Sequence, residues 1–249
     1  MPRAFLTAEW RNLVMLNYAV DPAILAPLVP AGTALDHWEG RTYVSLVGFL
    51  FANTRLLGLP IPFHRTFEEV NLRFYVRREV GGEVRRGVTF IKELVPRAAI
   101  AHVARMAYNE PYDAVPMRHS FGVIGDDGVP SSVRYGWRSS GHWNEIEVAP
   151  RGTGRRTDDH SEEQFITEHY WGYTRQRDGS TVEYRVSHEP WQVWAVAAPA
   201  VIGDWAATYG TAWSRILAAP PSSSFLADGS PVTVYTPTRF VAPPSARHA

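Results

Sequence analysis

Residues 68–78, Glu-Glu-Val-Asn-Leu-Arg-Phe-Tyr-Val-Arg-Arg, contain the clearest alternation of polar and apolar side chains in the sequence. Because successive side chains of a β-strand point to opposite faces of its sheet, this period of two predicts a strand. One predicted face is apolar and consists of Val70, Leu72, Phe74 and Val76. The other face carries Glu69, Asn71, Arg73, Tyr75 and Arg77.

The polar face of this strand has two interpretations. It is either a solvated outer face, as in many antiparallel sheets, or the inner face of a barrel that converges on a small ligand. In the second case Glu69 is a candidate general acid or base and Arg73 a candidate carboxylate anchor, with Asn71 as polar support.

Strand signals continue on both sides of this segment. Gly81-Gly82 predicts a turn into an antiparallel strand at 86–95, and Asp178-Gly179 predicts a hairpin between 169–175 and 181–188. The segment 98–108 has the composition of a helix. Many strands with two or three short helices predict one mainly β, barrel-like domain over 1–249. We expect a mobile loop at 151–161, which is rich in glycine and charge, and a frayed tail from Pro243.

The chain contains one lysine, Lys92, and therefore one side chain able to form a Schiff base with a carbonyl substrate. In regular alternation Lys92 shares a face with Val88, Phe90 and Leu94, where partial desolvation would depress its pKa. The alternative is an ion pair with Glu69, Glu93 or another carboxylate at the sheet edge. The sequence alone favours the ion pair.

Composition narrows the classes of partner. The chain has 249 residues, of which 45% are hydrophobic, with 25 acidic and 25 basic residues, so no net charge favours binding to nucleic acid or an acidic membrane. The absence of cysteine fits a cytoplasmic protein, and the first ten residues lack the pattern of a signal peptide. Neither a dinucleotide-binding motif nor metal-ligand spacing is present, which predicts no cofactor and no metal.

The order of the segments resembles the acetoacetate decarboxylase-like superfamily, and more closely an uncharacterised bacterial branch of it, a domain family of unknown function. The resemblance spans nearly the whole chain. It is carried by Trp10-Arg11-Asn12-Leu13, Asp21-Pro22 through Pro30, Glu68 through Arg73, Gly87-Val88 through Arg97, Val103-Ala104-Arg105, Tyr108 through Tyr112, Tyr173-Thr174-Arg175 and Val232 through Tyr235.

This resemblance implies a conical antiparallel β-barrel with a central pocket. In the decarboxylase, a lysine forms a Schiff base with a β-keto acid, aided by an arginine and glutamates. By position Arg11 corresponds to the pocket arginine, and Glu69, or failing that Glu68, lies near a catalytic glutamate. Where the family has its nucleophilic lysine, this sequence has Pro96-Arg97-Ala98-Ala99. Lys92 does not correspond, and the family's second lysine is absent.

We therefore expect the fold to be shared and the Schiff-base decarboxylation to be lost. The expected pocket holds Arg11 and Glu69 as catalytic residues, and Glu68, Asn71, Arg73, Lys92 and Arg97 as ligand-binding residues. Such a pocket suits a small anionic carbonyl metabolite. Three functions remain open: a lyase or isomerase acting by acid–base chemistry, a non-catalytic ligand-binding barrel, and a structural protein with a filled interior. A homo-oligomer is compatible with each.

Overall fold

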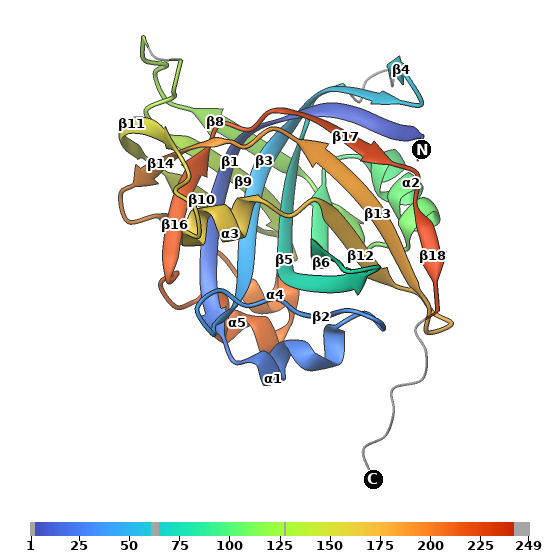
Figure 1. The fold of residues 1–249 in the computed structure, drawn as a ribbon. Coiled ribbons are helices and arrows are strands. Elements are labelled where there is room, and N and C mark those ends of the chain that lie inside the picture. Colours follow the sequence, from blue (N-terminus) through green and yellow to red (C-terminus); the bar gives the residue numbers. More distant parts are fainter. Residues whose placement is uncertain (1–2, 61–64, 127, 242–249) are drawn as a thin grey trace.

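The computed structural model describes residues 3–60, 65–126 and 128–241, which form two β-sheets and a few helices (Figure 1). This confirms the mainly β architecture predicted from the alternating segments. The predicted tail from Pro243 lies outside the described residues. Among the residues described, no helix has the length and apolar character needed to cross a bilayer.

Over the described residues, the main sheet has fourteen strands and the second sheet has four. Seven strands of the main sheet are central to the fold: β1 (Ala4–Val20), β3 (Thr42–Leu56), β5 (Phe67–Val80), β6 (Glu83–Val95), β12 (Trp171–Arg175), β13 (Thr181–His188) and β17 (Pro231–Tyr235). The other seven are β2 (Ala34–Leu35), β4 (Leu59–Pro60), β7 (Tyr112–Ala114), β11 (Pro150–Arg156), β14 (Gln192–Val196), β16 (Ser223–Ala227) and β18 (Thr238–Phe240).

The second sheet consists of β8 (Met117–Phe121), β9 (Val133–Ser139), β10 (His142–Val148) and β15 (Ala200–Ile202). The helices are α1 (Pro22–Leu25), the 3-10 helix η1 (Ala26–Leu28), α2 (Ala98–Tyr108), α3 (Glu162–Thr167), α4 (Trp205–Tyr209) and α5 (Thr211–Leu217).

The seven central strands pair in a closed circuit. In the order β1, β3, β5, β6, β12, β13 and β17, each strand is hydrogen-bonded to the next, and β17 pairs back with β1. These pairings are antiparallel except for β6–β12, which is parallel. The circuit therefore encloses an interior, and each of its strands has one face toward that interior and one face away from it.

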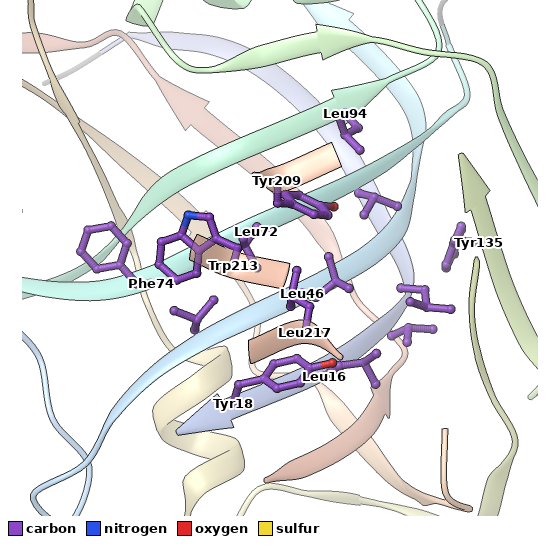
Figure 2. Close-up of a cluster of buried hydrophobic side chains, with 14 of the residues drawn as sticks. Leu16, Tyr18, Leu46, Leu72, Phe74, Leu94, Tyr135, Tyr209, Trp213 and Leu217 are labelled. Atoms are coloured by element: carbon purple, nitrogen blue, oxygen red, sulfur yellow. The ribbon is translucent and has the colours of Figure 1, made fainter. Parts of the chain in front are cut away.

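The outer face of β5 packs into a hydrophobic cluster, as its alternation predicts. Val70, Leu72, Phe74 and Val76 are fully buried there. Figure 2 shows Leu72 and Phe74 together with Leu16 of β1 and Leu46 of β3, against Tyr209 and Trp213 of the α4–α5 segment and Tyr135 of the second sheet. Because the apolar face of β5 is covered in this way, its polar face is turned to the interior of the circuit.

Both predicted hairpins are present. Gly81 and Gly82 adopt positive φ values of 58° and 84° in the turn between β5 and β6, and Gly179 has a φ of 83° between β12 and β13. Glycine occupies these positions because it adopts positive φ without a steric penalty. The β5–β6 turn sets the register of the two strands from Val80–Glu83 to Arg73–Phe90.

The segment 151–161 differs from its prediction. Its first half belongs to β11, which pairs with β14 from Pro150–Val196 to Arg156–Gln192. Of the two glycines in β11, Gly154 has a packing reason, since a Cβ there would lie 2.2 Å from Cζ2 of Trp194, whereas Gly152 adopts a positive φ of 69°. A glycine at 154 thus lets the indole lie directly on the strand.

Candidate functional site

A cavity of about 220 Å³ lies inside the circuit of central strands. Most of its lining is aromatic or aliphatic, and its polar lining side chains come mainly from β5, β6, β13 and the segment leading into β7. The polar lining residues are Thr54, Glu69, Asn71, Arg73, Glu93, Glu110, Tyr112, Thr167, His169, Tyr184 and His188. A concave, mostly apolar space with a few convergent polar groups is the usual form of a small-molecule site.

Three predicted residues, Glu69, Asn71 and Arg73, line this cavity side by side on the inner face of β5. Asn71 donates from Nδ2 to Oε1 of Glu69 at 3.0 Å, and the hydroxyl of Tyr112 donates to Oε2 at 3.2 Å. These two hydrogen bonds hold the side chain of Glu69 in one orientation. Glu69 is also buried, with 3% of its surface exposed. Fixed carboxyl groups of this kind can transfer protons with little reorganisation.

Burial raises the pKa of Glu69 to about 7, because the charged carboxylate is disfavoured away from water. The hydrogen bonds from Asn71 and Tyr112 and the positive charge of Arg73 act in the opposite direction. A carboxyl group with a pKa near neutrality is able both to accept and to release a proton at physiological pH.

Two further glutamates share this interior. Burial and the proximity of Glu110 and Glu69 raise the pKa of Glu93 well above its ordinary value. Burial, with a contribution from Glu69, raises the pKa of Glu110 to about 8. Because like charges in a dry space cannot all ionise, the cluster of Glu69, Glu93 and Glu110 holds protons at neutral pH.

Glu110 is held by neighbours on two other strands. It accepts a hydrogen bond from the hydroxyl of Tyr184 on β13 and a longer one, 3.5 Å, from Thr174 on β12. The ring of Tyr184 lies directly over Gly172, where a Cβ would approach the ring carbon Cζ to 2.0 Å. A glycine at 172 is thus needed for Tyr184 to reach the carboxyl group.

Among the described residues that line the cavity, Arg73 is the one arginine or lysine. Its Nη2 donates to the carbonyl of Ile166 at 3.4 Å, and its guanidinium carbon lies 5.7 Å from the ring centre of Tyr75. Nε of Arg73 is buried and has no hydrogen-bond partner in the described part of the chain. A donor that is buried and unused is costly, so this guanidinium is available to an anion in the cavity.

The two histidines of the lining carry no positive charge at neutral pH. Burial lowers the pKa of His169 to about 4 despite its contact with Asp36, whose Oδ2 lies 3.5 Å from Nε2. Burial also lowers the pKa of His188. Arg73 is therefore the fixed positive charge of the lining.

The structure does not bring Arg11, Glu68 or Arg97 into the cavity. Arg11 pairs with Glu9, with 2.6 Å between Nη2 and Oε2, and its side chain is 42% exposed. Its neighbour Trp10 lines the cavity instead, because alternation along β1 turns residue 11 outward. Glu68 faces away in the same manner and lies 2.7 Å from Nδ1 of His119, while Arg97 is exposed.

Lys92 also lies outside the cavity. Its Nζ is 3.0 Å from Oδ2 of Asp113 and donates to the carbonyl of Thr208 at 3.0 Å. The predicted face shared with Val88 and Phe90 is wrong, because the register of β5 and β6 shifts between Leu72–Lys92 and Arg73–Phe90. This β-bulge inserts Ile91 and reverses the alternation, so that Lys92 turns outward and Glu93 turns inward.

Four residues of the site lie outside the pocket predicted from the sequence: Glu93, Glu110, Tyr112 and Tyr184. From the sequence, Glu93 is a candidate only for an ion pair with Lys92. Its side chain points inward because of a β-bulge, and no sequence motif predicts that bulge. The resemblance did include the segment Glu110-Pro111-Tyr112, and an acidic residue two positions before a tyrosine was a usable signal. Within the described residues, no group of three or more His, Asp or Glu side chains is placed to hold a metal ion.

Glu110→Gln is expected to flatten the dependence of thermal stability on pH. The pKa of Glu110 in the folded protein is about 8 against an ordinary 4.5. Its contribution to stability is therefore fully present below about pH 4.5 and lost as the pH rises through 8. The melting temperature of the wild type should fall relative to that of Glu110→Gln across this interval, and the amide retains an oxygen that can accept from Tyr184.

The measurement is thermal unfolding of both proteins at a series of pH values. Taking the difference between them removes contributions from groups such as His169, whose lowered pKa acts in the opposite direction at acid pH. The exposed Glu83 supplies a matched control, and Glu83→Gln should follow the wild type. Parallel curves for Glu110→Gln and the wild type would refute a raised pKa at Glu110.

Solved structures share this fold. The enduracididine biosynthesis enzyme MppR complexed with pyruvate is 15% identical, with a TM-score of 0.68, over 96% of this chain and 91% of that one. Acetoacetate decarboxylase from Legionella pneumophila is 12% identical, with a TM-score of 0.68, over 96% and 88%. An acetoacetate decarboxylase-like enzyme from Sphingomonas wittichii RW1 is 14% identical, with a TM-score of 0.64, over 96% and 94%.

A curated relative is the uncharacterised protein YqjF of Bacillus subtilis, 28% identical over 183 residues, which are 73% of this chain and 72% of that protein. The model of the DUF2071 family, described as an uncharacterised conserved protein, matches residues 7–235. With the structural neighbours above, this confirms the family resemblance and the acetoacetate decarboxylase-like fold. The chain belongs to the DUF2071 family.

Proposed function

We propose that the cavity binds a small acid that contains a ketone, and that Glu69 moves a proton to or from the carbon next to that ketone without a covalent intermediate. The observation that carries this proposal is the pairing of Glu69 and Arg73 on one inner face: a buried carboxyl group with a pKa of about 7 and the fixed cation found among the described lining residues. Arg73 binds the carboxylate of the ligand, and Glu69 serves as the acid or base.

The other buried carboxyl groups fit this chemistry. The raised pKa values of Glu93 and Glu110 favour their protonated forms, which donate hydrogen bonds to ligand oxygens instead of repelling an anion. An enolate formed by proton removal would be stabilised by such donors in a space that excludes water. Pyruvate in the solved MppR structure supports a keto acid as the ligand, as an analogy of fold.

A covalent route through an amine has no support in this cavity. Lys92 is the only lysine of the sequence, and its amine contacts Asp113 and the carbonyl of Thr208 outside the lining. The predicted reaction class is therefore a lyase or isomerase that acts by acid–base catalysis without a covalent intermediate on the protein.

Sodium borohydride added in the presence of acetoacetate is expected to leave the intact mass of the protein unchanged. Borohydride reduces a Schiff base to a stable amine, so an adduct would reveal a covalent intermediate. The readout is intact mass spectrometry, with an enzyme known to form a Schiff base as the positive control. An adduct that disappears in Lys92→Arg would overturn the non-covalent route.

The experiment that tests the proposal is hydrogen–deuterium exchange on the ligand. Pyruvate, acetoacetate and phenylpyruvate are each incubated in deuterated buffer with and without protein, and proton NMR follows the carbon next to the ketone. We expect exchange of at least one acid to exceed the protein-free rate. The proposal fails if no acid binds, as judged by the melting temperature of the protein.

A non-catalytic binding protein is the second candidate. It is favoured by the lining itself, most of which is aromatic or aliphatic, as in sites that only bind a ligand. Ligand-dependent stabilisation with no exchange above background would select this function over an enzyme.

A further inference from the structure

We infer that the ligand of this cavity is amphipathic, an α-keto acid that carries an aromatic ring, and that a wall of aromatic side chains receives the ring. The inference rests on the proposed function, since it refines the ligand of the same site. It is carried by the contacts of Trp10, Phe49, Phe51, Phe67 and Trp191, all of which line the cavity.

These side chains form one continuous aromatic wall. The ring of Trp10 lies 5.7 Å from Phe49 and 6.1 Å from both Phe51 and Trp191, each in an edge-to-face arrangement. Phe51 stacks on Phe67 at 4.8 Å. Ring edges and faces are thus presented together, which is the arrangement that attracts a further aromatic ring.

The aromatic wall adjoins the polar residues of β5. Phe49 of β3 lies opposite Glu69 in the register of the sheet, and Phe51 lies opposite Phe67. Phe67 and Glu69 are neighbours on one face of β5, two residues apart. A ligand whose acid group reaches Arg73 would consequently extend its remaining part along Glu69 toward these rings.

A short acid would leave apolar surface of the cavity uncovered, and within the wall this surface belongs to Trp10, since Phe49, Phe51, Phe67 and Trp191 are already buried. Trp10 and Phe90 line the cavity and are only partly buried, so apolar surface stays exposed within it. Burying such surface against a ligand is favourable. The volume of about 220 Å³ is below the roughly 300–1,000 Å³ of typical ligand sites, which suits a single ring with a short acid group better than a nucleotide or a long chain.

The decisive measurement compares the affinities of three acids for the wild-type protein by calorimetry. Pyruvate provides the acid group alone, phenylpyruvate adds an aromatic ring, and cyclohexylpyruvate adds a saturated ring of similar size. Phenylpyruvate is expected to bind at least about tenfold more tightly than pyruvate, because the ring is removed from water, and more tightly than cyclohexylpyruvate because of ring–ring contacts.

Equal affinities of pyruvate and phenylpyruvate would overturn the inference and leave the proposed function intact. Equal affinities of the two ring-bearing acids would overturn the aromatic part of the inference. If none of the three acids binds, the proposed function itself fails.

Substitutions of Trp10 test whether the aromatic wall causes the tighter binding of phenylpyruvate. Trp10→Leu should weaken phenylpyruvate binding by about tenfold and leave pyruvate binding unchanged, while Trp10→Phe, which retains a ring, should recover most of the loss. Trp143→Leu removes a tryptophan that lies on β10 outside the lining and should change neither affinity. Circular dichroism verifies the fold of each variant. An equal loss for both acids in folded Trp10→Leu would contradict the assignment.

Discussion

Glu69→Gln is expected to lower the rate of proton exchange on a bound keto acid by about 10²–10⁴-fold, the range by which a positioned acid or base accelerates proton transfer. The amide is close in size to the carboxyl group and keeps an oxygen that can accept from Tyr112, but it cannot accept the proton. Affinity for the ligand should change little, since Arg73 remains. NMR-detected exchange in deuterated buffer provides the rate, and calorimetry provides the affinity.

The dependence of the rate on pH follows from the pKa of Glu69. If the ionised carboxylate removes the proton, the rate rises as the pH increases through about 7 and is constant above it. The rate falls below that value because burial favours the protonated form. Since Glu93 and Glu110 share the same interior, the midpoint belongs to the cluster and not to Glu69 alone.

The neighbouring residue gives a matched control. Glu68 precedes Glu69 on β5 but faces outward, where it contacts His119. Glu68→Gln makes the same chemical change one position along the strand, and should leave exchange at the wild-type rate. A comparable loss in both variants would show that the effect is not confined to the cavity.

The sequence predicts correctly which face of the sheet a side chain occupies where that face depends only on strand alternation. On β5 the apolar face is packed in the outer cluster, and the polar face lines the cavity. The alternation does not predict whether that polar face is exposed to solvent, because a strand in an open, solvated sheet and a strand in a closed circuit have the same local sequence pattern. Closure depends on β17 pairing with β1 across the whole length of the chain.

Strand alternation does not predict the directions of residues on irregular or short segments. The bulge at Ile91 exchanges the faces to which the side chains of Lys92 and Glu93 point. A regular alternation of polar and apolar residues does not predict where such a bulge lies. Glu110 precedes a strand of three residues, whose place beside β6 is set by tertiary pairing. The resemblance places Arg11 in the pocket, whereas Trp10 is the residue of β1 that lines the cavity.

Arg73→Gln is expected to weaken binding of an α-keto acid by about 2 kcal/mol or more, which is roughly 30-fold in Kd. The guanidinium is the fixed cation of the lining, and its loss leaves the ligand carboxylate in a low-dielectric space without a counterion. The methyl ester of the same acid, which has no carboxylate, should bind the variant and the wild type alike. Calorimetry with both ligands measures the difference.

Arg73→Gln should also move the pH dependence of exchange. The positive charge of Arg73 lowers the pKa of Glu69, so its removal raises that pKa further above 7 and shifts the midpoint of the rate to higher pH. Arg77, on the same strand but exposed, is the control, and Arg77→Gln should change neither affinity nor midpoint. If Arg73→Gln weakened the acid and its ester equally, the arginine would support the cavity wall without contacting the ligand. If the midpoint of the rate did not shift, the charge of Arg73 would have no effect on the pKa of the group that transfers the proton. That result would contradict the pairing of Arg73 with Glu69 as the acid or base.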